Sequence, residues 1–260
     1  MRADGFALAA LLGVIGGGLS GCELVVSGYA VEASAGGAHQ GGEGMEGGGP
    51  GSGGAATCTG LPNIGAWDFE GADALDGLEP LGALGGTVHD GVLVFEYAGQ
   101  TPGPGGRTFA FPPGTTRASV CAEARWDDVF DSQTLLLAAL ELTWTGGEYC
   151  GFFLALTTAG ALQLFAIATI DGDQVAIADE QGSVVPAASW QHIELFVDPV
   201  GGQVTARIGA SMVALDYAAE GFNQCPADPA NVRLTVGSAL SAPGTVVLEL
   251  DDLRVGRSAN

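Results

Sequence analysis

The residues from Cys58 onward predict an all-β domain, either an antiparallel sandwich or a barrel, on three observations. Short runs of β-forming residues are separated by Gly, Asp and Pro at a spacing typical of antiparallel sheets. Within several runs apolar and polar residues alternate, as they do in a strand with one buried face. Turn sequences suited to tight hairpins lie between neighbouring runs.

The first 21 residues have the features of a cleaved export signal. Arg2 is followed by an apolar stretch from Phe6 to Leu19 and then by two small residues. This stretch is too short and too rich in Gly for a stable membrane-spanning helix. We therefore predict a signal peptide over residues 1–21.

The end of this segment reads Leu19-Ser20-Gly21-Cys22 and resembles the lipobox of bacterial lipoproteins at all four positions. The resemblance implies that Cys22 becomes thioether-linked to diacylglycerol and is the acylated first residue of the mature protein. A plain secretory signal is the alternative. Because several acyl chains hold a protein firmly on a lipid surface, the membrane is the expected partner. Glu23 in place of Asp favours the outer membrane within the cell envelope.

Residues 22–57 are predicted to form a flexible tether. Between Ala33 and Ala56 the chain is almost entirely Gly, Ala, Ser and Glu, with no apolar periodicity to bury. A segment of about 24 such residues spans on average about 27 Å. His39 is expected to be a solvated linker residue, and the folded domain is expected to comprise residues 58–260.

The apolar runs of this domain place its strands in chain order. Only the Leu-rich run 135–144 lacks strict alternation and could be a helix instead. The predicted strands are 87–97, 107–111, 117–126, 135–144, 150–157, 161–170, 174–179, 190–198, 203–209, 212–217, 232–237 and 245–255.

Two turns and one irregularity add detail to this scheme. Asp171-Gly172-Asp173 and Asp198-Pro199-Val200-Gly201-Gly202 each lie between apolar runs and predict hairpins. In the last strand the apolar positions alternate up to Leu250 and resume at Leu253, which breaks the period of two. A β-bulge at Asp251-Asp252 would restore the buried face.

Four motifs follow one another along the domain: Trp67-Asp68-Phe69-Glu70-Gly71, Asp90-Gly91-Val92-Leu93-Val94-Phe95, Trp190-Gln191-His192-Ile193-Glu194-Leu195 and Leu250-Asp251-Asp252-Leu253-Arg254-Val255. In this order they resemble the recurrent motifs of concanavalin A-like, laminin G-like jelly rolls, over nearly the whole region from Trp67 to Val255. The resemblance implies two packed antiparallel sheets, one of them curved, with the first and last strands as neighbours. It also implies largely structural roles for the terminal acidic pair and for the strand that begins at Trp190.

The charge balance restricts the partners. Eight basic residues stand against 30 acidic residues, which leaves a net charge of −22. Such a surface repels phosphate backbones and anionic headgroups, so no nucleic acid partner is expected and the domain itself is not expected to bind lipid. Neutral polymers and divalent cations are better candidates.

Four cysteines remain once Cys22 is lipidated, and an even number in an exported chain predicts two disulfides. Four cysteines allow three connectivities, among which the sequence alone does not choose. We predict Cys121 with Cys150, from neighbouring strands, and Cys58 with Cys225, which would join the start of the domain to a late loop. A zinc site is the alternative, but no close Cys pair or Cys–His spacing supports it.

Many proteins of the resembled fold are glycoside hydrolases, which need paired carboxylates. The laminarinase-type members carry Glu-x-Asp-x-x-Glu on one strand. The nearest match here is Glu249-Leu250-Asp251-Asp252-Leu253-Arg254, where Arg254 takes the place of the second Glu. This departure disfavours hydrolysis by that mechanism.

A less regular set of polar residues offers another candidate site. Alternation leaves Glu123 and Arg125 on the polar face of their strand, and Glu141 and Gln163 could project similarly from nearby strands. If that face lined a concave groove, the four side chains would offer carboxylates and a guanidinium to a sugar. The alternative, which we weight more heavily, is a solvated face with an ordinary Glu–Arg pair. Candidate stacking residues are Tyr149, Trp144 and Phe153, although aromatic residues on strands usually belong to the core.

Asp171 and Asp173 could bind calcium, but they also suit a tight turn, and a calcium site needs about six oxygens. No cofactor is required by any motif. His89 and His192 are interpreted as structural histidines, since no nucleophile elbow, HExxH motif or phosphate loop accompanies them.

These observations favour a non-catalytic, lectin-like module that is displayed on the envelope and binds glycan or protein. The alternatives are a carbohydrate-active enzyme that uses Glu123 and Glu141, and a structural or adhesive envelope protein. Analogy at the level of the fold supplies most of this ranking.

Overall fold

The structure, a computed structural model, describes residues 58–82, 85–98, 105–127, 134–157, 160–170, 173–217, 225, 229–239 and 245–259. The predicted signal peptide and tether, with Cys22 and His39, lie outside the described residues, as does Asp171. In the described part of the chain, no helix is long and apolar enough to cross a membrane.

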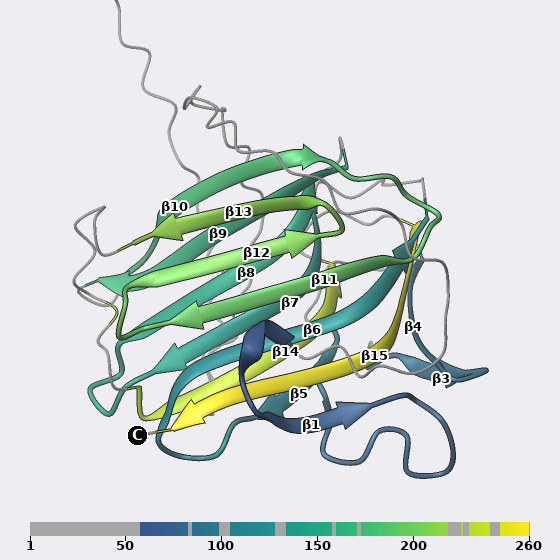
Figure 1. Cartoon of the computed structure of the whole chain (residues 1–260), viewed down its shortest axis with the longest axis horizontal. Helices are drawn as coiled ribbons and strands as arrows, with labels where there is room; N and C mark the ends of the chain where they lie inside the picture. Colours follow the sequence, from purple (N-terminus) through teal and green to yellow (C-terminus); the bar gives the residue numbers. More distant parts are fainter. Residues whose placement is uncertain are drawn as a thin grey trace, which may run out of the picture.

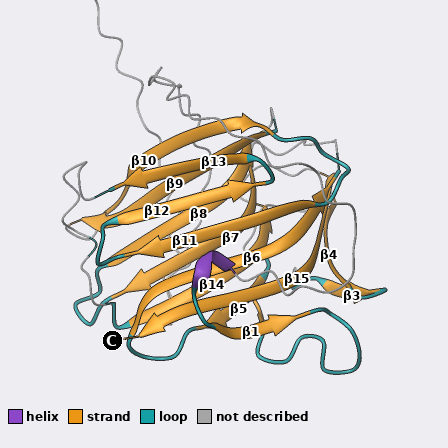
Figure 2. Cartoon of the chain, in the orientation of Figure 1, coloured by secondary structure: helices purple, strands orange, loops and turns teal. Residues whose placement is uncertain are grey.

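Two antiparallel sheets packed face to face make up the domain (Figure 1). Strands account for nearly all of its described elements (Figure 2), and the short 3-10 turn η1 (Cys58–Gly60) precedes the first of them. The predicted all-β class and the two-sheet jelly-roll sandwich are thereby confirmed.

Sheet A has the strand order β13-β12-β11-β6-β15-β4-β3, and β1 pairs with β15 outside that order. The pairing of β1 with β15 confirms that the first and last strands are neighbours. The strands of sheet A are β1 (Asn63–Trp67), β3 (Thr87–His89), β4 (Val92–Ala98), β6 (Thr115–Trp126), β11 (Gln191–Asp198), β12 (Gln203–Ile208), β13 (Ser211–Asp216) and β15 (Thr245–Ala259).

Sheet B has the strand order β10-β9-β8-β7-β14-β5-β2. The run from β7 to β10 is a meander of consecutive hairpins, as the local turn signals predict. The strands of sheet B are β2 (Glu79–Pro80), β5 (Arg107–Ala110), β7 (Thr134–Thr143), β8 (Tyr149–Thr157), β9 (Ala161–Ile170), β10 (Asp173–Val184) and β14 (Asn231–Ala239).

The run 135–144 is a strand, β7, and its missing alternation has a physical cause. Its inward residues, such as Leu140, join the main core between the sheets. Leu136 and Ala139 project from the opposite face and are also buried, in a second apolar cluster with Phe153. Because both faces of this strand are apolar, its sequence lacks the period of two that marks a half-solvated strand.

The bulge predicted in the last strand is confirmed. Asp251 pairs with Glu123 and Arg254 pairs with Cys121, so three steps along β15 match two along β6. Asp252 takes a positive φ of 51° at this point. The extra residue returns Leu253 to the buried face.

The predicted strand boundaries need two corrections. The single strand predicted at 87–97 is a hairpin of β3 and β4, because Asp90 and Gly91 both take positive φ, at 49° and 76°. A two-residue turn with both residues in this region is the usual route between paired strands. The short strands β1 and β2 were not predicted, since neither carries a long apolar run.

The predicted disulfide pairing, Cys121–Cys150 with Cys58–Cys225, is wrong. The structure joins Cys58 to Cys121 and Cys150 to Cys225, with Cα–Cα distances of 5.5 and 5.8 Å. Cys121 lies on β6 in sheet A, whereas Cys150 lies on β8 in sheet B and packs in the core. Only β7 separates these two strands in the sequence, but the fold places their cysteines in different sheets.

Candidate functional site

A group of polar and aromatic side chains lies on the outer face of sheet A. Val120, Ala122 and Ala124 of β6 pack in the core, which turns Glu123 and Arg125 outward. The neighbouring strands β11 and β15 place further polar residues opposite these two in register. We call the following residues the sheet A patch: Glu123, Arg125, Trp190, His192, Glu249 and Asp251.

Arg125 organises one end of the sheet A patch. Its Nε donates to a carboxylate oxygen of Glu249, and its Cζ lies 4.9 Å from the ring centroid of Trp190. A guanidinium at this distance attracts the ring face. Trp190 is 39% exposed, and the other exposed large hydrophobic residues in the described part of the chain are aliphatic. The patch therefore presents an accessible indole held beside an ion pair.

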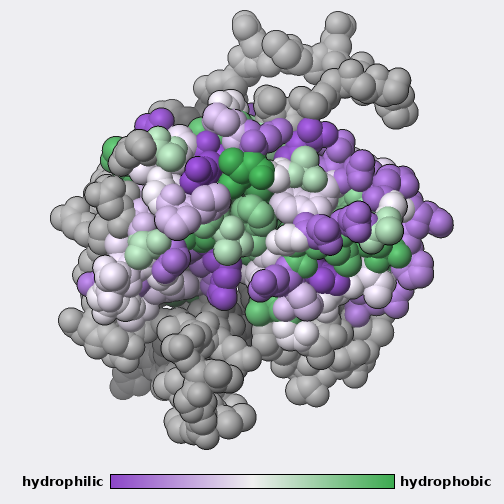
Figure 3. All heavy atoms as spheres, turned by 90° about the horizontal axis from the view of Figure 1, so that it is seen from below, coloured by the Kyte–Doolittle hydropathy of each residue, from purple (hydrophilic) through white to green (hydrophobic). Residues whose placement is uncertain are grey.

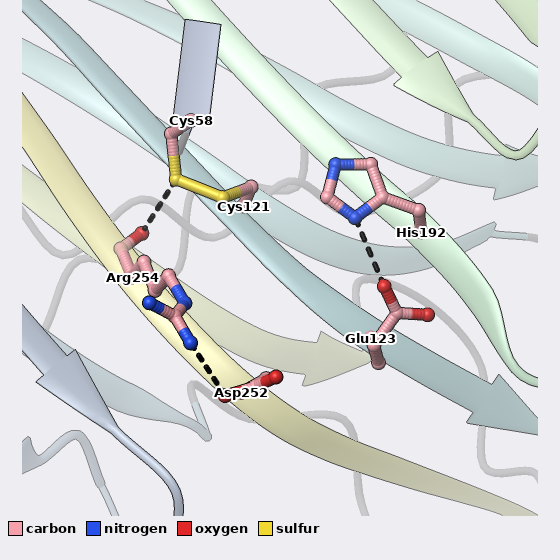
Figure 4. Close-up of a disulfide and its surroundings, with 6 residues drawn as sticks. All are labelled: Cys58, Cys121, Glu123, His192, Asp252 and Arg254. Atoms are coloured by element: carbon pink, nitrogen blue, oxygen red, sulfur yellow. Dashed lines mark hydrogen bonds and ion pairs between the residues drawn. A yellow bond between two sulfur atoms is a disulfide. The ribbon is translucent and has the colours of Figure 1, made fainter. Parts of the chain in front are cut away.

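Glu123 and His192 form the second contact of the patch. Oε1 of Glu123 lies 3.0 Å from Nδ1 of His192, and the pair lies close to the Cys58–Cys121 disulfide (Figure 4). The two side chains are 40% and 34% exposed. Because the pair is partly solvated, it adds little to stability, and both groups remain accessible to a polar ligand.

Asp251 completes the patch on β15. Its Oδ1 accepts a hydrogen bond of 2.7 Å from the backbone N–H of Asp252. Burial raises the pKa of Asp251, and the negative charges of Asp252, Asp68 and Glu123 raise it further. The folded protein thus keeps a carboxylate where its charge is unfavourable.

Asp251→Asn is expected to stabilise the domain at neutral pH. A raised folded pKa means that the folded state binds the proton more tightly than the unfolded chain does, so stability falls as the pH rises between the ordinary Asp pKa and the folded value. Asn removes the charge and keeps the acceptor for Asp252. The gain should be a few tenths of a kcal/mol at neutral pH and should vanish near pH ~3. Urea denaturation across this range would measure it, and a less stable variant at neutral pH would show that Asp251 has a favourable partner instead.

A second polar cluster lies on the outer face of sheet B around Glu141. Its Oε1 accepts from the hydroxyl of Tyr149 at 3.1 Å, and its Oε2 accepts from Arg233 Nε at 2.9 Å and from Thr235 Oγ1 at 3.2 Å. The Glu141 side chain is only 7% exposed. Gly151 pairs with Glu141 in register, and a Cβ there would lie 2.4 Å from the Tyr149 hydroxyl. Because both carboxylate oxygens are engaged and buried, this cluster is structural.

The four residues predicted to share one groove do not come together. Glu123 and Arg125 project from the outer face of sheet A, whereas Glu141 and Gln163 are buried residues of sheet B. Packed sheets lie about 10 Å apart, and side chains on their two outer faces are farther apart still. Glu123 and Glu141 are therefore too distant to act as a glycosidase pair. The chain crosses from one sheet to the other between β6 and β7.

The remaining site predictions have mixed outcomes. Trp144 packs against the core, and Phe153 stacks on Phe165 at 4.8 Å between centroids, so neither offers a free platform. The calcium hypothesis rests on Asp171, which lies outside the described residues, and on Asp173, of which only the backbone is described, as the first residue of β10. Among the described side chains no group of three or more potential ligands could hold a metal ion.

Sequence reasoning missed four members of the sheet A patch as site residues. Trp190, His192 and Asp251 were assigned structural roles, and Glu249 was considered only for a motif that fails. Alternation does place these residues opposite the buried set of their strands. It does not show that β11 and β15 flank β6, and this adjacency is what assembles the patch.

Figure 3 shows the molecule from below, the side on which β1 lies in Figure 1. On this face hydrophobic residues form separate groups between hydrophilic ones.

Comparison with known proteins identifies a similar fold and no family. No family model matches the chain, and no curated protein matches it. The structure is similar to that of alginate lyase A1-II', a member of polysaccharide lyase family-7, with a TM-score of 0.50, 11% identity, and coverage of 66% of this chain and 82% of that one. This likeness concerns the jelly-roll sandwich alone.

Two further solved structures are similar at lower scores. The CBM2 module of the evolved Dit protein of Lactobacillus casei BL23 phage J-1 has a TM-score of 0.49 and 8% identity, and the match covers 76% of this chain and 96% of that one. A GH43 protein, BlXynB from Bacillus licheniformis, has a TM-score of 0.47 and 8% identity, with coverage of 74% and 39%.

Proposed function

We propose that the domain is a glycan-binding module whose binding surface is the sheet A patch. The observation that carries this proposal is the exposed Trp190 ring, which Arg125 holds in place while Glu249 holds Arg125. A fixed indole supplies a flat apolar surface with little conformational freedom to lose on binding. Glu123, two residues from Arg125 on β6, and its partner His192, two residues after Trp190, supply hydrogen-bonding groups for sugar hydroxyls.

The similar alginate lyase is by its name an enzyme that acts on a polysaccharide, and the shared sandwich fold is compatible with a glycan ligand. At 11% identity the likeness carries no catalytic residues to this chain. The net charge of −22 argues against a polyanionic ligand and for a neutral or cation-bridged one.

The module would work at the cell envelope. In this proposal Cys22 carries the lipid, residues 22–57 are the tether, and the outer membrane is the anchoring surface. We expect Cys22→Ser to move the protein from the membrane fraction to the soluble one. The intact mass of the wild-type mature protein should equal that of residues 22–260 plus acyl chains. A mature N-terminus other than Cys22 would refute the anchor.

Trp190→Ala is expected to weaken glycan binding at least about tenfold, which corresponds to about 1.4 kcal/mol. A secreted chain of residues 22–260 carrying Cys22→Ser would first be screened on a glycan array, with and without calcium. The best ligand would then be titrated by calorimetry against Trp190→Ala and Arg125→Ala.

The matched control is Val200→Ala, because Val200 is also exposed and lies in the turn after the far end of β11. This variant should bind like the wild type. Equal binding by all variants would place the site elsewhere on the domain, and no binding to any glycan would favour a protein partner.

A further inference from the structure

The tether enters the domain at the strand that carries the sheet A patch. Cys58, the first described residue, is bonded to Cys121 of β6, and Glu123 follows two residues later on the same strand (Figure 4). Cys121 pairs with Glu194 of β11 on one side and with Arg254 of β15 on the other. The covalent link therefore reaches the interior of sheet A rather than its edge.

Without this link, tension along the tether would enter the domain through β1. This strand has five residues and pairs only with β15, where Asn63 lies opposite Gly256. The start of β1 thus lies beside the C-terminal end of β15. Pulling the two chain ends apart would load this antiparallel pair from one end and break its hydrogen bonds one after another, which needs little force.

With the link, the same tension enters β6 at Cys121. The β6–β15 pairing continues from Arg254 opposite Cys121 to Ala259 opposite Thr115. Pulling Cys121 against the end of β15 loads these pairs along the strand direction and in parallel, so they share the force. The pairing of β6 with β15 also extends over more residues than any other strand pairing of sheet A. On its other side, β6 is paired with β11.

We propose that the Cys58–Cys121 disulfide is a mechanical clamp, which passes tether tension directly into β6 and keeps β1 unloaded. Glu123 and Arg125 lie two and four residues from Cys121, so a ligand held by the patch and the tether would pull on one short stretch of one strand. This last step rests on the proposed glycan site, whereas the clamp itself does not.

The clamp can be tested by pulling single molecules of the chain 22–260, carrying Cys22→Ser, between its two ends. Removing the clamp with Cys58→Ala and Cys121→Ala should give a first unfolding event at about half the wild-type force or less. It should also lengthen the fully extended chain by about 220 Å, because residues 59–120 become extensible. The matched control is Cys150→Ala with Cys225→Ala, which leaves the tether connection intact and should keep a high-force first event.

A second variant keeps all cysteines and covers the case in which the clamp-free protein does not fold. A ten-residue Gly-Ser segment inserted after Pro62 lengthens the chain between Cys58 and β1. If the clamp carries the load, the force curve before the first unfolding event should match the wild type. Extra extension of about 35 Å before that event would show that β1 carries the load and would overturn the proposal. Neither measurement uses a ligand, so glycan binding and the clamp can fail independently.

Discussion

Loss of the Cys150–Cys225 disulfide is expected to lower the free energy of unfolding by about 4 kcal/mol. The bond closes a loop with a sequence separation of 75 residues, and a loop of this length restricts the unfolded chain strongly. Cys150 lies on β8 in the middle of sheet B, and Cys225 lies between β13 of sheet A and β14 of sheet B. The bond therefore fastens the connection by which the chain returns from one sheet to the other.

The variant that tests this is Cys150→Ala with Cys225→Ala, compared with the wild type by urea denaturation. Both sulfur positions are buried, so Ala avoids placing new polar groups in the core. Peptide mapping without reduction should recover Cys58 linked to Cys121 and Cys150 linked to Cys225. A loss below about 1 kcal/mol would mean that the bond constrains a chain already restricted in the unfolded state.

Glu141→Leu is expected to cost about 3 kcal/mol, since it removes the acceptor from three donors at once. The hydroxyls of Tyr149 and Thr235 belong to buried residues and would lose this hydrogen bond, and Arg233 would lose its ion pair. Leaving a buried donor unsatisfied costs about 1–3 kcal/mol. Glu141→Gln keeps one acceptor oxygen and should lose less.

Glu123→Leu is the matched control for Glu141→Leu. Glu123 also lies on an outward face with one charged or polar partner, but its side chain is 40% exposed. We expect a change within about 0.5 kcal/mol, because a solvated pair contributes little. Thermal or urea denaturation of the Glu141 and Glu123 variants would measure both changes in the free energy of unfolding. Equal losses at the two positions would contradict the distinction between a structural cluster on sheet B and an accessible patch on sheet A.

Most of the strands could be predicted because the signal for a strand is local. The period of two identified the buried set of β12, for example Val204 and Ile208, and the break at Asp251 located the bulge. The hairpin signal at Asp171-Gly172 predicts the pairing of β9 with β10, and Ile170 does pair with Asp173. An equally strong signal at Asp90-Gly91 separates β3 from β4 within the run predicted as one strand.

The candidate site could be predicted only in part. Alternation assigns Glu123, Arg125 and Glu141 to polar faces of their strands, and it does so correctly for the first two. Glu141 shows the limit of this rule, because an outward position on a sheet face can still be buried within a hydrogen-bonded cluster. Exposure depends on what surrounds the face, and this information is not local.

The sequence by itself determined the fold class, the positions of most strands and the buried face of those that alternate, such as β6, β12 and β15, because these depend on backbone geometry repeated over a few residues. Only the tertiary structure decided which strands are neighbours, and hence that Cys58 meets Cys121 and that Trp190 meets Arg125. Sheet assignment depends on long-range pairing, such as β6 with β15, between segments more than a hundred residues apart. A period of two is the same in either sheet, so it cannot tell which of the two outer faces a polar residue occupies.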